Sequence, residues 1–171
     1  QIAQRIKDRC KEKGYTIKLI AKSQVDSVSG EITSTVLPTF VDLKKTIALV
    51  NNEYNGVLIG SSLADEQFLY GKGAGRFPTS SAVLSDISAL KYDYKYSIRK
   101  FDQTENAQFN QTGNVKIFIG YEKEELDLNS FFNEIEERFQ GKEYSYVVGE
   151  ISLEKLKEII HHPAYSVVAF E

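Results

Sequence analysis

The chain of 171 residues has no methionine, no tryptophan and a single cysteine, Cys10. One cysteine excludes a disulfide within the chain, and we therefore expect a reducing, cytoplasmic location. Methionine is absent at position 1 as well, where Gln1 stands, so we expect a segment cut from a longer protein. The first residues do not resemble a secretion signal, and no apolar run approaches the ~20 residues of a membrane-spanning helix. We expect no membrane partner.

Clustered charge of one sign is also missing. The formal net charge is −3, and the acidic residues lie mostly in the C-terminal half. The small basic excess of residues 1–91 is scattered, whereas a phosphate backbone needs a basic patch. We expect no nucleic-acid partner. With 42% hydrophobic and 26% charged residues, the composition is that of a globular protein long enough to bury its own core.

The pattern of apolar residues in the first third predicts one helix and two strand pairs. Ile2, Ile6 and Cys10 recur four residues apart, which predicts a helix over 1–13 that ends at Gly14. Runs rich in β-branched and aromatic residues, separated by turn residues, predict the strands. These strands span 15–22, 31–37, 54–60 and 66–70.

Two prolines predict changes of structure. Pro38 is expected to end a strand, and Asp42 is expected to cap a helix that contains Leu43, Ile47 and Val50. Pro78 suits the first turn of a further helix that continues to Leu90. The sequence then loses its periodicity over residues 92–113, and we interpret this polar, amide-rich stretch as a linker.

The last third predicts a small α+β unit with two helices on one face of a sheet. Five apolar residues at helical spacing predict the first helix; these are Leu128, Phe131, Phe132, Ile135 and Phe139. Ser152 is the expected N-cap of the second. The predicted order is strand 114–121, helix 128–140, strand 144–149, helix 153–161 and strand 165–170.

One glycine-rich segment follows a predicted strand and precedes a predicted helix. Gly71, Gly73 and Gly75 alternate there, and glycine permits both positive φ and the close approach of another surface. The segment is not the dinucleotide fingerprint, since its third glycine is misplaced and no βαβ continuation follows. The spacing alone leaves a ligand-binding loop and a purely structural turn equally open.

Spaced matches around this segment resemble one enzyme family, the homoserine dehydrogenases. The glycine loop and helix resemble the family signature at Gly73-Ala74-Gly75, Pro78-Thr79, Ser81-Ala82-Val83 and Asp86. The run Gly14-Tyr15-x-Ile17-Lys18-Leu19-x-Ala21 resembles a family strand. Four dipeptides fall in the family's order, namely Leu37-Pro38, Leu49-Val50, Asn55-Gly56 and Tyr70-Gly71.

The resemblance implies the NADPH- or NADH-dependent reduction of a small molecule, aspartate 4-semialdehyde, to homoserine, a step of threonine and methionine biosynthesis. It places a main-chain glycine beside the nicotinamide, and that role falls on Gly75 or, less favoured, Gly73. The following helix would point Thr79 and Ser80 towards the active-site cleft. The nucleotide-binding domain, catalytic lysine and catalytic acids are expected before Gln1, so no residue here is named as catalytic. The chain alone is expected to be inactive.

The resemblance also implies that residues 114–171 form an ACT-like, ferredoxin-like regulatory unit. Only five of the six expected elements are evident in the sequence. The turn 122–127 lacks the proline and glycine of that class's effector-binding turn, which argues against threonine regulation.

Several residues have both a functional and a structural interpretation, and for each the structural one is favoured. Lys72 and Arg76 flank the glycines, and we interpret them as solvent-exposed charges of the loop. Adjacent helical residues such as His161 and His162 diverge too far to share a metal ion. Cys10 lies on the apolar face of a predicted helix, so we interpret it as a core residue rather than as a nucleophile.

We therefore predict an α+β protein with a mixed sheet covered by helices on one face. Its predicted parts are a catalytic and dimerisation region over 1–91, a linker over 92–113 and the ACT-like unit over 114–171. A homodimer is expected, with the protein's own N-terminal nucleotide-binding domain as a further partner. The alternative from a different class is a stand-alone amino-acid-binding regulatory module that has no catalytic half.

Overall fold

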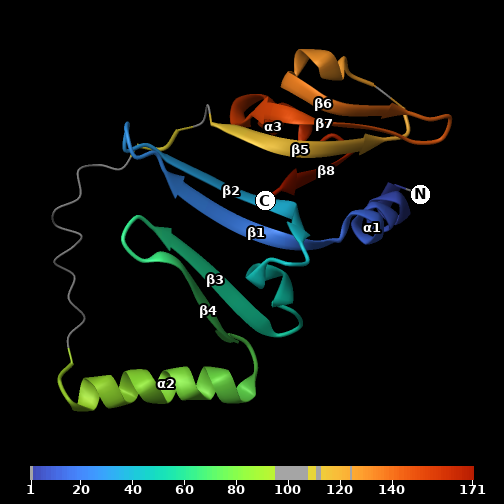
Figure 1. The fold of residues 1–171 in the computed structure, drawn as a ribbon. Coiled ribbons are helices and arrows are strands. Elements are labelled where there is room, and N and C mark those ends of the chain that lie inside the picture. Colours follow the sequence, from blue (N-terminus) through green and yellow to red (C-terminus); the bar gives the residue numbers. More distant parts are fainter. Residues whose placement is uncertain (1, 95–107, 111–112, 124) are drawn as a thin grey trace. The chain divides into compact units, whose positions relative to one another are not determined.

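The computed structural model describes residues 2–94, 108–110, 113–123 and 125–171. Contacts group the chain into two units, one of residues 1–43 with 107–171 (unit 1) and one of residues 44–106 (unit 2). Most of the predicted linker 92–113 lies outside the described residues. This grouping differs from the predicted division at that linker, because the first strands of the chain share a sheet with the last ones (Figure 1).

Unit 1 is built around a six-stranded mixed sheet, which confirms the predicted α+β class. The strand order is β1-β2-β8-β5-β7-β6, and every neighbouring pair is antiparallel except β2 and β8. The elements are α1 (Ile2–Lys13), β1 (Tyr15–Val25), β2 (Ile32–Asp42), β5 (Asn114–Tyr121), η2 (Leu128–Ser130), β6 (Phe132–Gln140), β7 (Ser145–Ser152), α3 (Leu153–Ile159) and β8 (Tyr165–Phe170).

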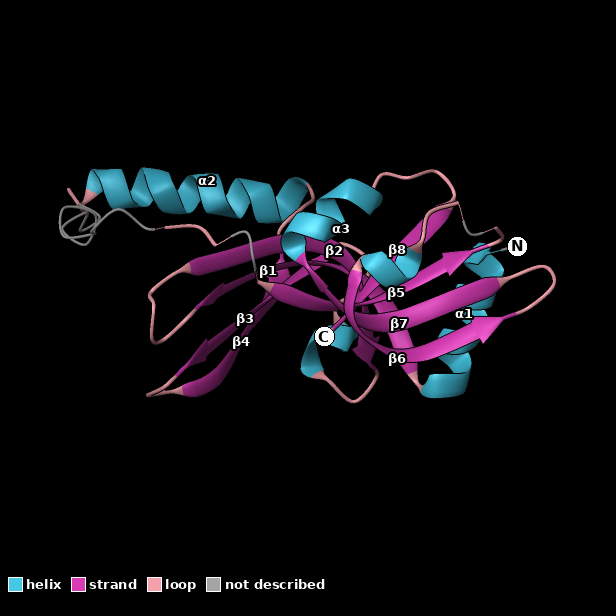
Figure 2. Cartoon of the chain, turned by 90° about the horizontal axis from the view of Figure 1, so that it is seen from above, coloured by secondary structure: helices cyan, strands magenta, loops and turns pink. Residues whose placement is uncertain are grey.

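Both faces of this sheet are covered, each by a different helix (Figure 2). Side chains alternate along β5, so that Ile117 and Ile119 face α3 while Phe118 faces α1. All three are 0% exposed. The expectation of helices on a single face is therefore wrong for the whole sheet, because the N-terminal helix packs on the face opposite α3.

The predicted helix 128–140 is wrong, and the error has a physical cause. Only the short 3-10 helix η2 is helical there, and β6 follows as a strand paired with β7. The register shifts between Phe132 and Glu134 and again between Ile135 and Glu137. Each β-bulge adds a residue and breaks the two-residue alternation. The first bulge thereby places Phe132 and Ile135, three residues apart as in a helix, on the same face, whereas Phe139 lies on the other face beside Tyr146.

Pro38 does not end a strand, since β2 continues through it to Asp42. Pro38 lies opposite Leu19 of β1, and β8 joins the other edge of β2 only at Thr39 and Phe40. Pro38 thus lies before the second neighbour begins, and one missing N–H is tolerated there. Asp42 is the last residue of β2 rather than a helix cap, and the predicted helix behind it is a four-residue 3-10 helix, η1 (Thr46–Leu49).

Unit 2 contains η1, the hairpin β3 (Tyr54–Ser61) and β4 (Asp65–Lys72), and the helix α2 (Arg76–Lys91). The predicted strand pair and the helix around Pro78 are confirmed. Gly56 of β3 lies so close to Val50 and Phe68 that a Cβ there would be 2.5 Å from Val50 Cγ2 and 2.9 Å from Phe68 Cε2.

Within the described residues, no helix is long and apolar enough to cross a bilayer.

Candidate functional site

The glycine loop joins the end of the β3–β4 hairpin to α2. The hairpin register ends at the pair Tyr54 and Lys72, and the residues 73–75 connect it to Arg76, where α2 begins. Gly75 has φ 113° and ψ 157°, a conformation that side chains with a Cβ rarely adopt. The amide of Thr79 donates to the carbonyl oxygen of Gly75 at 3.1 Å and closes the first helical turn.

The backbone of this loop is exposed and lies between two surface hollows of about 360 and 590 Å³ that share Gly75 and Arg76. The smaller hollow is lined by Glu53, Lys72, Ala74, Gly75, Arg76, Phe77 and Pro78. A Cβ added to Gly75 would meet only Pro78, at 3.6 Å from its Cδ, and one added to Gly71 would meet nothing within 4 Å. No side chain of the described residues therefore covers the main chain at these two glycines.

Lys72 is held by neighbours rather than projecting freely. Its Nζ donates to Oε1 of Glu53 at 2.7 Å and lies 5.1 Å from the centre of the Tyr54 ring. This hydrogen bond lowers the pKa of Glu53 below its ordinary value and raises that of Lys72. Both side chains are close to half exposed, so water screens the pair and its contribution to stability is small. The pair orients Lys72 across the strand ends beside the loop.

Stacked rings stiffen the hairpin up to the loop. Tyr54 and Tyr70 lie with ring centres 4.8 Å apart and planes 5° apart, and Phe68 stacks on Tyr70 at 5.8 Å. Cross-strand aromatic contacts of this kind stabilise a two-stranded sheet that is otherwise marginal. The loop therefore starts from a fixed strand end.

The first turn of α2 has one hydroxyl already bonded within the helix. Ser80 Oγ donates to the carbonyl oxygen of Arg76 at 2.8 Å, while Thr79 is exposed at the larger hollow. Arg76 lies 5.7 Å from the centre of the Phe77 ring. The orientation of Thr79 and Ser80 towards a cleft stays a prediction.

The other candidate residues have structural roles. Cys10 is buried, and burial raises the pKa of its thiol, which opposes nucleophilic reactivity. His162 Nδ1 accepts a hydrogen bond from the amide of Ala164 at 3.3 Å, and its ring lies 4.8 Å from that of Tyr165. Across the described residues, no group of three His, Cys, Asp or Glu side chains is placed to hold a metal ion.

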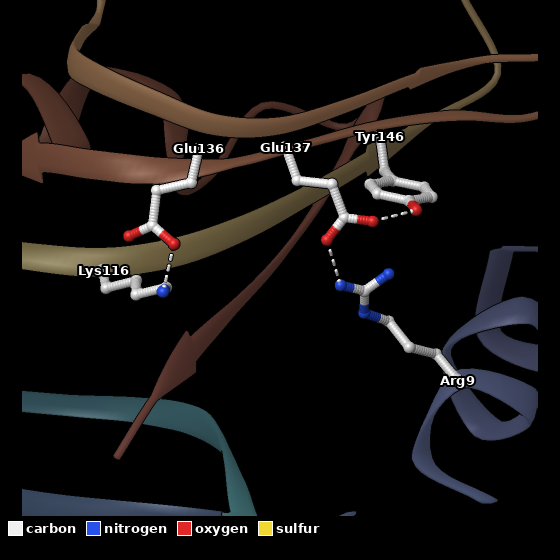
Figure 3. Close-up of polar contacts among 5 residues, drawn as sticks. All are labelled: Arg9, Lys116, Glu136, Glu137 and Tyr146. Atoms are coloured by element: carbon white, nitrogen blue, oxygen red, sulfur yellow. Dashed lines mark hydrogen bonds and ion pairs between the residues drawn. The ribbon is translucent and has the colours of Figure 1, made fainter. Parts of the chain in front are cut away.

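An ionic cluster around the largely covered side chain of Arg9 in unit 1 was not predicted (Figure 3). Arg9 of α1 donates to Oε2 of Glu137 at 2.8 Å, and the hydroxyl of Tyr146 donates to Oε1 at 2.5 Å. The Arg9 guanidinium also lies over the rings of Tyr146 and Phe118, at 4.8 and 5.4 Å. The separation of 128 residues between Arg9 and Glu137 leaves no local sequence signal. Lys116 and Glu136 form a second ion pair nearby.

Comparisons with known proteins agree on one family. A sequence model described as homoserine dehydrogenase matches residues 1–88. The homoserine dehydrogenase of Bacillus subtilis (strain 168) is 33% identical over 113 residues, which are 66% of this chain and 23% of that protein. That of Synechocystis sp. is 40% identical over 78 residues, which are 43% of this chain and 18% of that protein. The chain thus matches less than a quarter of the length of these relatives.

Solved structures extend the similarity to nearly the whole chain. A homoserine dehydrogenase from Thiobacillus denitrificans has a TM-score of 0.69 at 19% identity, and the match covers 96% of this chain and 44% of that chain. The S. aureus homoserine dehydrogenase has a TM-score of 0.55 at 26% identity, with 96% and 43% covered. The shared fold therefore includes the residues after 88, which the family match does not reach.

Proposed function

The chain belongs to the homoserine dehydrogenase family, and we propose that it supplies the nicotinamide-facing loop of an enzyme that reduces aspartate 4-semialdehyde to homoserine with NADPH or NADH. The observation that carries this proposal is the exposed main chain at Gly75, inside the matched region and directly before a helix. We place the reaction in threonine and methionine biosynthesis and in the cytoplasm.

The role proposed for Gly75 is to leave room for a flat ring. A bound nicotinamide supplies the hydride, and the protein contributes the surface that orients the ring. Any side chain at Gly75 would project into the hollows that meet there, and its φ of 113° would also strain the backbone. Gly73 is the second candidate for this contact, because it is also exposed, but the side chain of Asn55 lies against it.

The remaining catalytic parts are proposed to come from a preceding nucleotide-binding domain. None of the residues of α2, all of which the structure describes, is buried. Phe77, Leu84 and Leu90 of this helix are 80%, 65% and 78% exposed. An apolar helix surface of this kind favours a covering partner. A second copy of the chain could also cover such a surface, which supports a homodimer. Because the other catalytic parts are proposed to lie in the preceding domain, the chain alone is proposed to lack activity.

The C-terminal unit is proposed to be ACT-like. Its elements follow the order β5, η2, β6, β7, α3 and β8, so that η2 and β6 together take the place of the predicted helix 128–140. The four strands lie in the order β8-β5-β7-β6, and η2 and α3 contribute to the same core. This strand order supports a ferredoxin-like arrangement in which the first helix is shortened. The turn before η2 is held by Tyr165, whose hydroxyl accepts from the amides of Glu125 and Leu126 at 3.0 and 2.7 Å.

The test joins the chain to its preceding domain in the full-length protein and follows NADPH and NADH oxidation with aspartate 4-semialdehyde. We expect turnover by the full-length protein and none by the chain alone. Gly75→Ala should raise KM for the dinucleotide, while Gly71→Ala, at a position with free space and no positive φ, should not. A full-length protein that binds an amino acid but oxidises neither dinucleotide would support the regulatory-module alternative and contradict the proposal.

A further inference from the structure

We propose that the C-terminal unit, residues 114–171, completes the fold of the family-matched region by holding α1 and β2 in a shared core, and that it is not a detachable regulatory module. The family match ends at residue 88, so this unit lies outside it. The inference deepens the proposed function and rests on it only where activity is measured. Its other support is a set of contacts within unit 1.

Strand β2 is buried on both faces by side chains of the C-terminal unit. Leu37 joins the core on the face of α3, and all the other buried members of that core belong to the C-terminal unit. Phe40 lies on the opposite face and is 1% exposed, with its ring centre 5.7 Å from that of Phe118 and 5.1 Å from that of Phe170. The main chain is joined as well, because the carbonyl oxygen of Phe40 accepts from the amide of Glu171 at 3.3 Å.

Helix α1 is held by the same unit. Its side chains Ile6 and Cys10 are buried in one cluster with residues of β5, β7 and β8. Polar contacts follow the same path, since Arg9 donates to Glu137 of β6, which also accepts from the hydroxyl of Tyr146 of β7 (Figure 3). The helix therefore packs against three strands of the C-terminal unit and forms an ion pair with a fourth.

The matched region has little core of its own. Among those of its residues whose side chains the structure describes, six hydrophobic residues are buried, and four of these lie in the two clusters shared with the C-terminal unit. Burial of apolar side chains offsets the conformational entropy that folding removes. A domain on a linker keeps a separate core and leaves its neighbour folded when it moves away. Displacing residues 114–171 would instead expose the core side chains of α1 and β2.

The single cysteine of the chain provides the first experiment. Cys10 is buried, so the thiol reagent DTNB should react with it only when α1 opens. Leu156 of α3 is 3% exposed and lies in the core on the other face of the sheet. Leu156→Ala should nevertheless accelerate the labelling of Cys10 on the order of 100-fold, because α1 should open only together with the C-terminal unit.

The matched control is Leu84→Ala on α2, which removes the same atoms from a side chain that is 65% exposed. It should change the labelling rate by less than about twofold. If Leu156→Ala prevents folding, Ile119→Val makes a smaller change in the same core and should still accelerate labelling several-fold. A labelling rate that neither core substitution changes would show that α1 opens without the C-terminal unit, and it would overturn the proposal.

The second experiment uses the full-length protein and separates the proposal from the enzyme assignment. Amide hydrogen exchange at rising temperature shows when β5 and α3 unfold, and oxidation of NADPH or NADH shows when activity is lost. Leu156→Ala should lower both temperatures by the same amount. Turnover that persists after β5 and α3 have unfolded would identify a detachable module and overturn the proposal. If the natural full-length protein oxidises neither dinucleotide, the proposed function fails, while the labelling of Cys10 still decides whether the core is shared.

Discussion

Unit 1 and unit 2 reach their structures by different routes. In unit 1, the sheet is buried on both faces by α1 and α3, and side chains such as Phe118, Ile117 and Val147 are completely buried. In unit 2, Ala48 is the single buried residue among 44–94. One unit is therefore held by a core drawn from distant parts of the sequence, and the other by contacts within a hairpin and a helix.

The difference bears on function, because the candidate loop lies in the unit without a core. A loop that meets a ring held by another domain, as we propose for this one, needs an open surface, and such a domain would cover the apolar residues around it. The C-terminal residues, by contrast, bury their apolar side chains against α1 and β2. The two units should consequently respond differently to matched substitutions.

The largest contrast is expected between two phenylalanines. Phe118 is 0% exposed and Phe77 is 80% exposed. Phe118→Ala should lower the free energy of unfolding by about 3–5 kcal/mol, because it leaves a cavity in the core. Phe77→Ala should change it by no more than about 0.5 kcal/mol. Urea unfolding followed by circular dichroism measures both, and similar losses would show that unit 2 has a hidden core.

The next contrast compares two cations that each combine an ion pair with an aromatic ring. Arg9 has a side chain only 14% exposed, whereas that of Lys72 is 44% exposed. Arg9→Ala should cost about 1–3 kcal/mol, because it removes the hydrogen bond to Glu137 together with the contacts of the guanidinium on the rings of Tyr146 and Phe118. Lys72→Ala should change the free energy of unfolding much less, because water screens its ion pair with Glu53. Unfolding at low and high salt gives both values, and an equal cost would contradict the difference in burial.

The Arg9 cluster also predicts a pH dependence. The hydrogen bond from Arg9, followed by that from Tyr146, holds the pKa of Glu137 below its ordinary value of 4.5. A carboxyl group with a lowered pKa in the folded state contributes stability that is present above its unfolded pKa. That contribution is lost as the pH falls through the folded pKa. Glu137→Gln should therefore flatten the acid side of the stability profile, measured as thermal midpoint between pH 6 and pH 3, and an unchanged slope would contradict it.

The sequence predicts what local patterns determine and misses what distant contacts determine. The strands β5 and β8 and the helix α1 with Gly14 after it are predicted correctly, because turn residues, caps and apolar spacing are local signals. The helix predicted over 128–140 fails because a β-bulge places Phe132 and Ile135 on one face at a helical spacing of three. The sequence suggests a special backbone position in the glycine loop, but only the structure shows that it is Gly75 that has the positive φ.

The smallest effect on the chain itself is expected on α2, and it sharpens the comparison most. Leu84 is 65% exposed and lines the larger hollow beside Gly75. Leu84→Gln should change the free energy of unfolding of the chain by less than about 0.5 kcal/mol, because no core contact is lost. In the full-length protein the same substitution should lower stability and activity, since it places an amide in the surface that we propose the preceding domain covers. Thermal unfolding of both forms gives the comparison, and Val57→Gln on the exposed face of β3 provides a second position. A substitution equally silent in both forms would mean that this face stays in water, and the preceding domain would then have to approach the glycine loop from another side.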